Sequence, residues 1–318
     1  MKDQINWLLS SSPWVEYRTQ RDLLALPEDQ IEVQRSRAAM LSSQKVINLV
    51  SEVTNWPGSP LISHKSAGHA IHKLVFLADL GLNIHDPGMQ ELIDRVMQHQ
   101  EDDGVFQMLT NIPIHFGGSG TDVWAWALCD APSVNYALIK FGLSNHPAVQ
   151  KSVETLTSLV RQNGWPCASS TKYGKFHGPG RKEDPCPYAN LIMVKMLAAF
   201  SDSRESEACK LGAESLLDCW QRRLTYHPYI FYMGNDFCKL KAPLVWYDIL
   251  HVVTVLSQLP WLKEDLRLKE MKSIIASKSN NDGLFTPESV WMAWKDWDFS
   301  QKKIPSAWLT YLAIKALR

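Results

Sequence analysis

Apolar runs that begin at or near a proline recur along the chain. Five contain the proline, at residues 12–17, 131–136, 186–191, 242–250 and 304–310, and a sixth run, residues 66–74, lacks it. Proline suits the first position of a helix, because that position needs no N–H donor and the fixed φ of proline is already helical. We therefore expect helices that begin at Pro13, Pro132, Pro187, Pro243 and Pro305.

Amphipathic stretches lie between these runs, at residues 31–53, 87–99, 148–161, 204–222 and 262–277. A helix that is apolar nearly all round is buried, whereas a helix with one apolar face covers something else. No stretch with period-two alternation is long enough to indicate a sheet. The pattern predicts an all-α fold in which buried and covering helices alternate.

Six buried helices, each followed by a covering helix at intervals of roughly fifty residues, form a repeat in which neighbours complete one another's cores. We expect these pairs to close into an (α/α)6 toroid, a single domain of residues 1–318. Closure is favoured because the aromatic runs that follow Trp14 and Pro305 would otherwise lie at exposed edges. An open, curved solenoid is the alternative.

The composition is that of a globular protein with a large core. Hydrophobic residues make up 45% of the chain and charged residues 21%, and 33 basic residues balance 33 acidic ones. A balanced charge supplies no field that would attract nucleic acid or anionic lipid. Residues 1–13 lack a basic region followed by a long apolar core, and no later run is apolar enough to cross a bilayer. We expect a cytoplasmic protein without a transmembrane segment or a nucleic-acid partner.

Cysteine and tryptophan usage adds two expectations. The six cysteines contain no CxxC pair and lie in a large chain, so a disulfide framework is not expected. The 13 tryptophans require either a large aromatic core or a cavity lined with aromatic rings.

Three glycine-containing turns carry a family resemblance. Residues 100–106 (QEDDGVF) fit the Gln-x-x-Asp-Gly-x-aromatic repeat of squalene and oxidosqualene cyclases, and residues 163–165 and 281–285 look like degraded copies. This resembles the α/α-toroid superfamily of class II terpenoid cyclases and protein prenyltransferase β-subunits. The segments 129–132, 186–189 and 246–248 also resemble a family of small bacterial proteins labelled prenyltransferase-like. A purely structural role for each turn is the other interpretation, because Gly frees the backbone and the ring packs between helices.

The sequence departs from these families at their catalytic motifs. It lacks the Asp-x-Asp-Asp motif with which class II cyclases protonate their substrates, and the aspartate-rich magnesium motif of other terpene synthases. No residue-by-residue match exists to the Asp, Cys and His that bind zinc in protein prenyltransferases.

In a closed toroid the buried helices run in one direction, so their N-termini converge on one mouth that favours an anion. Alignment of the runs predicts a polar mouth above an aromatic wall, suited to a partly apolar ligand. The substrate-binding residues that we predict there are Trp246, Tyr247, Trp308, Asn135, Asn190, Tyr188, His72, Trp126, Glu16 and Tyr17. The competing interpretations are that the asparagines bridge helices, the tryptophans fill the core, and His69 with His72 form a structural pair.

Asp248 is the predicted acid or base, because a carboxyl group in an aromatic pocket has a raised pKa. Asp130 is a second proton-transfer candidate, and His69 is a possible catalytic partner of either. A salt bridge from Asp248 to Lys239, Lys241 or Arg181 would instead make this carboxylate structural. Residues 117–120 (GGSG) are a weak phosphate-binding signal, and we interpret them as a flexible lid.

No cofactor is predicted, and one metal site is kept as an alternative. Cys129 and Cys186 each precede a buried-helix proline, so both thiols would lie near helix N-termini, which lower thiol pKa values. With His69 and Asp130 they would give zinc a mixed set of soft and imidazole ligands.

These features together predict a terpenoid cyclase-like or prenyltransferase-like enzyme, of the lyase, isomerase or transferase type, that acts on a hydrophobic substrate such as an isoprenoid. Aromatic faces would stabilise positive charge that develops in the substrate. The alternatives are a non-catalytic carrier that uses the same cavity, and a scaffold whose interior is filled by side chains.

Overall fold

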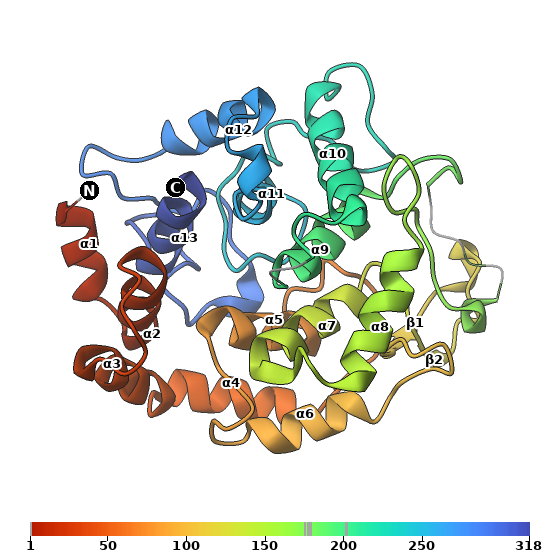
Figure 1. Cartoon of the computed structure of the whole chain (residues 1–318), viewed down its shortest axis with the longest axis horizontal. Helices are drawn as coiled ribbons and strands as arrows, with labels where there is room; N and C mark the ends of the chain where they lie inside the picture. Colours follow the sequence, from red (N-terminus) through yellow and green to blue (C-terminus); the bar gives the residue numbers. More distant parts are fainter. Residues whose placement is uncertain (1, 175, 177–179, 201–202) are drawn as a thin grey trace. The chain divides into compact units, whose positions relative to one another are not determined.

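The computed structural model describes residues 2–174, 176, 180–200 and 203–318. This part of the chain forms thirteen α-helices and one two-stranded antiparallel sheet (Figure 1). The expectation of a mostly helical fold is confirmed, and the expectation that no sheet forms is wrong. The backbone divides into two compact units, Glu52–Gly234 and the combination of Met1–Ser51 with Asn235–Arg318. The single domain over residues 1–318 stays a prediction.

The unit Glu52–Gly234 has three buried helices in contact: α5 (Ala70–Leu80) packs on α7 (Ala131–Leu138), and α7 packs on α9 (Pro187–Ala198). A π-helical turn, Ile139–Leu143, continues α7. Every residue of α9 is buried, as its nearly continuous apolar sequence predicts. The helix α5 ends at Gly81, whose φ of 92° is the left-handed conformation of a glycine C-cap.

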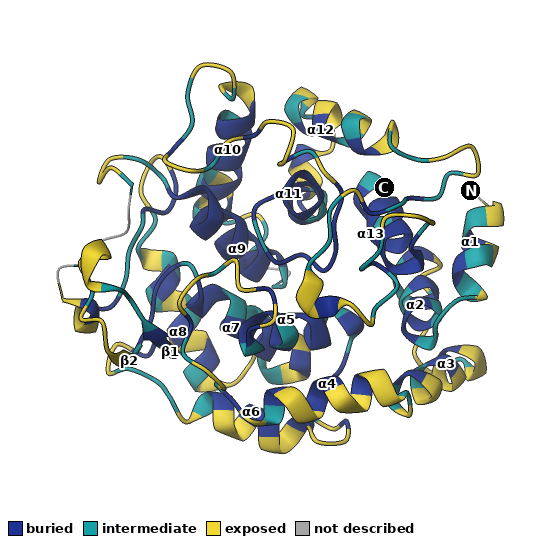
Figure 2. Cartoon of the chain, turned by 180° about the vertical axis from the view of Figure 1, so that it is seen from behind, coloured by how far each residue is buried: buried dark blue, intermediate teal, exposed yellow. Residues whose placement is uncertain are grey.

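The covering helices of this unit are amphipathic, as Figure 2 shows by their exposed outer faces. They are α6 (Met89–Met97), α8 (Pro147–Ser158) and α10 (Glu207–Gln221), of which α8 packs on α7 and α10 on α9. Gly212 allows α10 to approach closely, because a Cβ at this position would lie 2.4 Å from the ring of Trp165. The alternation of buried and covering helices is therefore present here.

A short sheet in the same unit joins β1 (Met108–Asn111) to β2 (Asp122–Ala125), with Leu109 opposite Trp124. Tyr173 packs against the sheet beside Ala125, and its hydroxyl accepts a 2.6 Å hydrogen bond from Thr110 Oγ1. Each strand has four residues, which is too short for an alternating pattern to be recognised. This explains why the sequence did not indicate the sheet. Residues 117–120 belong to the β1–β2 connection.

The unit formed by the two ends of the chain also has buried and covering helices. Its helices are α1 (Lys2–Leu9), α2 (Pro13–Arg18), α3 (Ile31–Leu41), α11 (Ile249–Leu256), α12 (Leu266–Ala276) and α13 (Ala307–Leu317). A π-helical turn, Thr19–Leu23, continues α2, and α4 (Gln44–Thr54) crosses the division between the units. Contacts join α11 to α12 and α13, and α2 to α3 and α13. Single 3-10 turns lie at Ile114–Phe116, Thr171–Tyr173, Pro260–Leu262 and Met292–Trp294.

The expected helix starts are confirmed at Pro13, Pro132 and Pro187, which occupy the first or second position of α2, α7 and α9. The expectation is wrong at Pro243, because α11 begins at Ile249 after an irregular segment. It is also wrong at Pro305, because α13 begins at Ala307. In both cases an N-cap side chain, Asp248 or Ser306, accepts a hydrogen bond from a first-turn N–H and determines where the helix starts.

The buried helices run in the same direction within each unit. In the unit Glu52–Gly234, Asp130 before α7 contacts His64 before α5 at 3.3 Å, and Lys195 near the end of α9 contacts Asp79 near the end of α5, also at 3.3 Å. In the other unit, Ser257 at the end of α11 donates a 2.8 Å hydrogen bond to Ala316 O near the end of α13. Helix starts therefore lie beside helix starts, and helix ends beside helix ends.

Candidate functional site

Asp248 is the N-cap of α11 and is fully buried. Its Oδ1 accepts a 3.0 Å hydrogen bond from His251 N. Its Oδ2 makes no hydrogen bond with any residue that the structure describes. Burial raises the pKa of Asp248 to about 7, against the lowering effects of the Lys241 charge and the backbone N–H groups of His251 and Leu250. A carboxyl group with this pKa exchanges its proton near neutral pH, which is what a general acid or base requires.

Two aromatic residues precede Asp248 directly in the sequence, and the charge of Lys241 acts on its carboxyl group. Tyr247 is buried, with its ring 5.3 Å from that of Phe237, and Trp246 is partly exposed. Lys241 is also buried, with its Nζ 5.2 Å from the ring centre of Trp291. The salt bridge considered for Asp248 is not made by Lys239, which instead contacts Asp236 at 3.2 Å.

Trp308, Glu16 and Tyr17 have structural surroundings within the same unit. Trp308 is 1% exposed and its ring lies 5.0 Å from that of Tyr311, as expected of a ring that packs in the core, and its place in a cavity wall stays a prediction. The Tyr17 hydroxyl donates a 3.4 Å hydrogen bond to Glu28, and Glu16 lies 3.8 Å from Arg35.

The two predicted amides, Asn135 and Asn190, make hydrogen bonds to buried neighbours. Asn135 Nδ2 donates to Ala131 O at 3.0 Å and to Ser152 Oγ on α8 at 2.8 Å, so this side chain bridges a buried helix and its covering helix. Asn190 accepts a hydrogen bond from Trp165 N and donates to Trp165 O and Cys186 O, each at 2.9 Å. The amide group of Asn190 is thus fully bonded to buried neighbours, whereas Asn135 Oδ1 is buried without a hydrogen bond to the described residues, and the substrate-binding role of both stays a prediction.

Asp130 and His69 are also held by local structure. Asp130 Oδ1 accepts from Ala127 N at 3.0 Å, and its Oδ2 lies 3.3 Å from His64 Nε2. His69 is the N-cap of α5: its Nδ1 accepts from Ile71 N at 3.2 Å, and its Nε2 lies 2.9 Å from Ser59 O. Since both ring nitrogens are occupied, the assignment of His69 as a zinc ligand or proton carrier is corrected to a structural cap. Burial also lowers the pKa of His69.

His72 and Trp126 likewise have buried partners. His72 Nε2 lies 2.9 Å from His64 O, whereas His69 Nε2 lies 2.9 Å from Ser59 O, so the two predicted histidines contact separate residues of one loop. Trp126 Nε1 donates a 2.9 Å hydrogen bond to Asp103 Oδ2 in the turn at residues 100–106.

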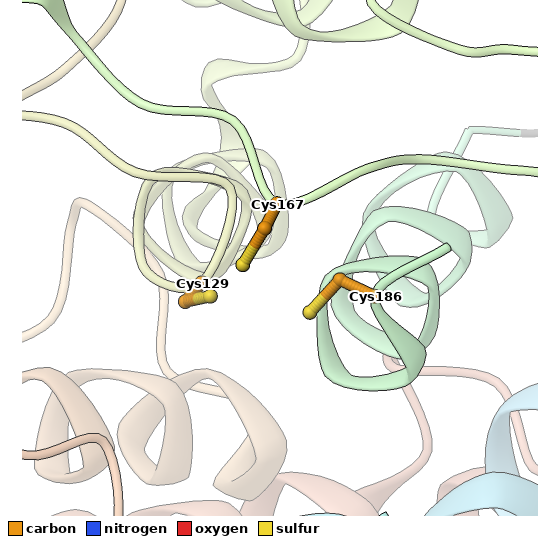
Figure 3. A group of neighbouring side chains, drawn as sticks. All are labelled: Cys129, Cys167 and Cys186. Carbon is orange, nitrogen blue, oxygen red and sulfur yellow. The ribbon is translucent and has the colours of Figure 1, made fainter. Parts of the chain in front are cut away.

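Cys129 and Cys186 are brought together, as the sequence suggested, and Cys167 completes the group. The three sulfur atoms lie within 4.8 Å of one another (Figure 3). Cys186 is the buried N-cap residue of α9, whereas Cys129 and Cys167 are partly exposed. Tyr188 is buried close by, and burial together with the neighbouring Cys129, Asp130 and Cys186 raises its pKa. His69 is not part of the cluster.

Sequence reasoning missed Cys167 and His64. Cys167 follows the turn at residues 163–166, so the position of that turn between two helices was a usable signal. His64 lies in an irregular loop without motif or periodicity. Its position beside Asp130 depends on packing of the loop against α7.

Two shallow hollows lie on the unit Glu52–Gly234. One, of about 350 Å³, is lined in part by Ile93, Met97 and Leu143, and the other, of about 470 Å³, in part by Val153 and Leu197. None of the predicted site residues lines either hollow. Across the described residues, no helix combines the length and apolar character needed to cross a membrane.

The comparisons with known proteins assign no family. No protein-family model matches the chain, and neither does any curated protein. Among solved structures, the chain is similar to a protein from Actinoplanes, with a TM-score of 0.42 and 16% sequence identity. That alignment covers 96% of this chain and 89% of the Actinoplanes chain.

Proposed function

We propose that the protein is an enzyme of the terpenoid cyclase-like or prenyltransferase-like type, which uses Asp248 as a general acid or base on a hydrophobic small molecule such as an isoprenoid. The observation that carries the proposal is the buried Asp248 carboxyl group, with one oxygen that makes no hydrogen bond to the described residues and a pKa raised by burial to about 7. The helix cap needs only Asp248 Oδ1, which accepts the hydrogen bond from His251 N.

A closed (α/α)6 toroid is part of this proposal. It is supported by the alternation of buried and covering helices and by the common direction of the buried helices within each unit. Location in the cytoplasm is also proposed, supported by six cysteines that are all free.

In this proposal the carboxyl group gives its proton to an alkene or leaving group, or removes one from a carbocation. The neighbouring rings of Tyr247 and Trp246 would stabilise positive charge in the substrate. Buried Lys241 would favour the ionised carboxylate after proton donation, because its charge lowers the pKa of Asp248.

The substitution Asp248→Asn tests the proposal, because asparagine caps a helix as well as aspartate does and removes only the titratable group. The purified protein is incubated with short-chain prenyl diphosphates, farnesol and squalene, and products are identified by gas chromatography and mass spectrometry. We expect Asp248→Asn to lower turnover by roughly 10²–10⁴-fold while ligand affinity is retained.

The matched control is Asp265→Asn, which changes the N-cap aspartate of α12 in the same way. Its turnover should equal that of the wild type. Unchanged turnover in Asp248→Asn would rule out Asp248 as the acid or base. If the wild type bound one of these compounds but did not convert it, the result would favour a non-catalytic carrier.

A further inference from the structure

Three cysteines from separate segments meet in the unit Glu52–Gly234. Cys129 precedes α7, Cys167 follows the turn at residues 163–166, and Cys186 precedes α9. Figure 3 shows the three side chains around a common space, with sulfur atoms that lie within 4.8 Å of one another. The three cysteines are far apart along the chain, so only the fold brings their thiols together.

Backbone hydrogen bonds hold these three segments together beside the cysteines. Leu128 N donates to Ala168 O at 2.9 Å, which joins the neighbours of Cys129 and Cys167. Cys186 N donates to Trp165 O at 2.8 Å, which joins the third segment to the same turn. The thiols are therefore pre-organised, as ligands of a bound ion must be.

The surroundings do not favour reactive thiols. Contact with the other thiols, together with burial, raises the pKa of Cys129. Because the thiolate is the nucleophile, a thiol with a raised pKa is a poor one. A bound cation would lower the pKa of these thiols, since a thiol that coordinates a metal ion is deprotonated.

We propose that Cys129, Cys167 and Cys186 together bind one thiophilic divalent cation of the zinc type, with a fourth position open to water or an added ligand. Each thiol releases its proton to solvent as its sulfur coordinates the ion. A tetrahedral site with Zn–S bonds of about 2.3 Å requires sulfur atoms about 3.8 Å apart, so shifts of about 1 Å suffice. Sulfur ligands select soft ions over magnesium or calcium.

Neighbouring groups suit a cation at this position. Asp130 adds a buried carboxyl group next to Cys129, and it is oriented by Ala127 N and His64. Carboxylates and histidines that orient one another beside a metal site tune its affinity. Cys129 and Cys167, being partly exposed, give the ion a path to the buried Cys186. This site is independent of the chemistry proposed for Asp248.

The experiment uses the full-length protein, stripped of metal with a chelator, kept reduced, and titrated with Zn²⁺ and with Cd²⁺. We expect one ion per chain, and a thiolate-to-cadmium charge-transfer band in the ultraviolet. Cys167→Ser should weaken binding by roughly 100-fold or more, because it removes a direct ligand. Cys129→Ser should do the same.

The matched control is Cys238→Ser, which removes a partly exposed cysteine outside the cluster. It should bind both ions as the wild type does. Circular dichroism separates loss of binding from loss of fold, and zinc should raise the Tm of the wild type but not that of Cys167→Ser. The proposal is overturned if the reduced wild type binds no more cadmium than folded Cys167→Ser, or if Cys238→Ser lowers binding equally. A disulfide within the cluster that persists under reducing conditions would also overturn it.

Discussion

At the scale of a single residue, Asp248 caps a helix and also places a carboxyl oxygen in the protein interior without a hydrogen bond to the described residues. The carboxyl group accepts the His251 N–H and so fixes the start of α11. A buried polar atom without a partner costs stability, and a buried charge costs more. A buried carboxyl group with a strongly shifted pKa is a candidate for a catalytic role.

The pH dependence of stability gives a prediction for Asp248. Its pKa is about 7 in the folded protein, against an ordinary value of 3.8, so the folded state holds a proton that the unfolded state has released. The contribution of the neutral carboxyl group is complete below about pH 4 and is lost as the pH rises through about 7. Three pKa units correspond to about 4 kcal/mol at most. Asp248→Asn should therefore be more stable than the wild type at about pH 8. This advantage should be smaller or absent at about pH 5.

Urea unfolding of both proteins at the two pH values measures this difference. Asp265→Asn is again the control, because hydrogen bonding to Arg267 holds the pKa of Asp265 below its usual range. The advantage of that carboxylate is present above about pH 4 and is lost as the pH falls, so its variant should show no gain at about pH 8. A pH-independent difference for Asp248→Asn would contradict the burial argument.

At the scale of elements, two of the three glycine-containing turns, residues 163–165 and 281–285, are tied to buried helices by equivalent hydrogen bonds. Trp165 N donates to Asn190 Oδ1 at 2.9 Å, and Phe285 N donates to Thr310 Oγ1 at 3.0 Å. The separation along the chain is 25 residues in both cases. The structural interpretation of these turns is thereby supported, since an aromatic residue packs between helices while a polar side chain holds its backbone.

Asn190→Ala tests the strength of this connection. The substitution removes three hydrogen bonds and leaves Trp165 N, which is buried, without its acceptor. We expect the free energy of unfolding to fall by about 3 kcal/mol, because an unsatisfied buried donor costs about 1–3 kcal/mol in addition to the lost bonds. Denaturant unfolding gives the value.

Asn163→Ala is the matched change in the same turn. Asn163 is exposed and donates one 2.8 Å hydrogen bond, to Glu183 O. Its loss should cost about 1 kcal/mol or less. Equal effects of the two substitutions would mean that the buried connection is no stronger than a surface hydrogen bond.

At the scale of the whole molecule, a charged network connects the beginning of the chain to its end within one unit. Asp22 accepts a 2.7 Å hydrogen bond from Arg18 and a 2.6 Å bond from Lys315, and Tyr311 also donates to it. Burial alone would raise the pKa of Asp22, but the charges of Arg18 and Lys315 outweigh burial and hold the pKa below its usual range. The contact joins the turn after α2 to α13.

Asp22→Asn should destabilise the protein by about 3–5 kcal/mol at neutral pH, because Arg18 and Lys315 then lack a counter-charge. The stabilising effect of the Asp22 carboxylate is present above about pH 4 and is lost as the pH falls, so the two proteins should converge at low pH. Asp236→Asn, in an exposed pair with Lys239, should change stability by about 0.5 kcal/mol or less. Thermal unfolding at neutral and acid pH checks both, and similar losses in the two variants would contradict the network's role.

The sequence predicted much of the fold and part of the candidate site. Proline at a helix start and period-3.6 patterning act locally, so the starts at Pro13, Pro132 and Pro187 followed from them. The same rule was wrong at Pro243, where the capping side chain of Asp248 determines the start. The partners of Asn135, Asn190 and Trp308 could not be predicted, because helical position does not tell which neighbour a buried side chain meets.

The sequence by itself determined that buried and covering helices alternate, because hydrophobic periodicity is a local property of each segment. Only the tertiary structure decided which side chains meet. It brought Cys167 to Cys129 and Cys186, occupied both nitrogens of His69, and buried Asp248 with one oxygen that makes no hydrogen bond to the described residues. These outcomes depend on long-range packing between segments far apart along the chain, and no local pattern encodes the distance between two such atoms.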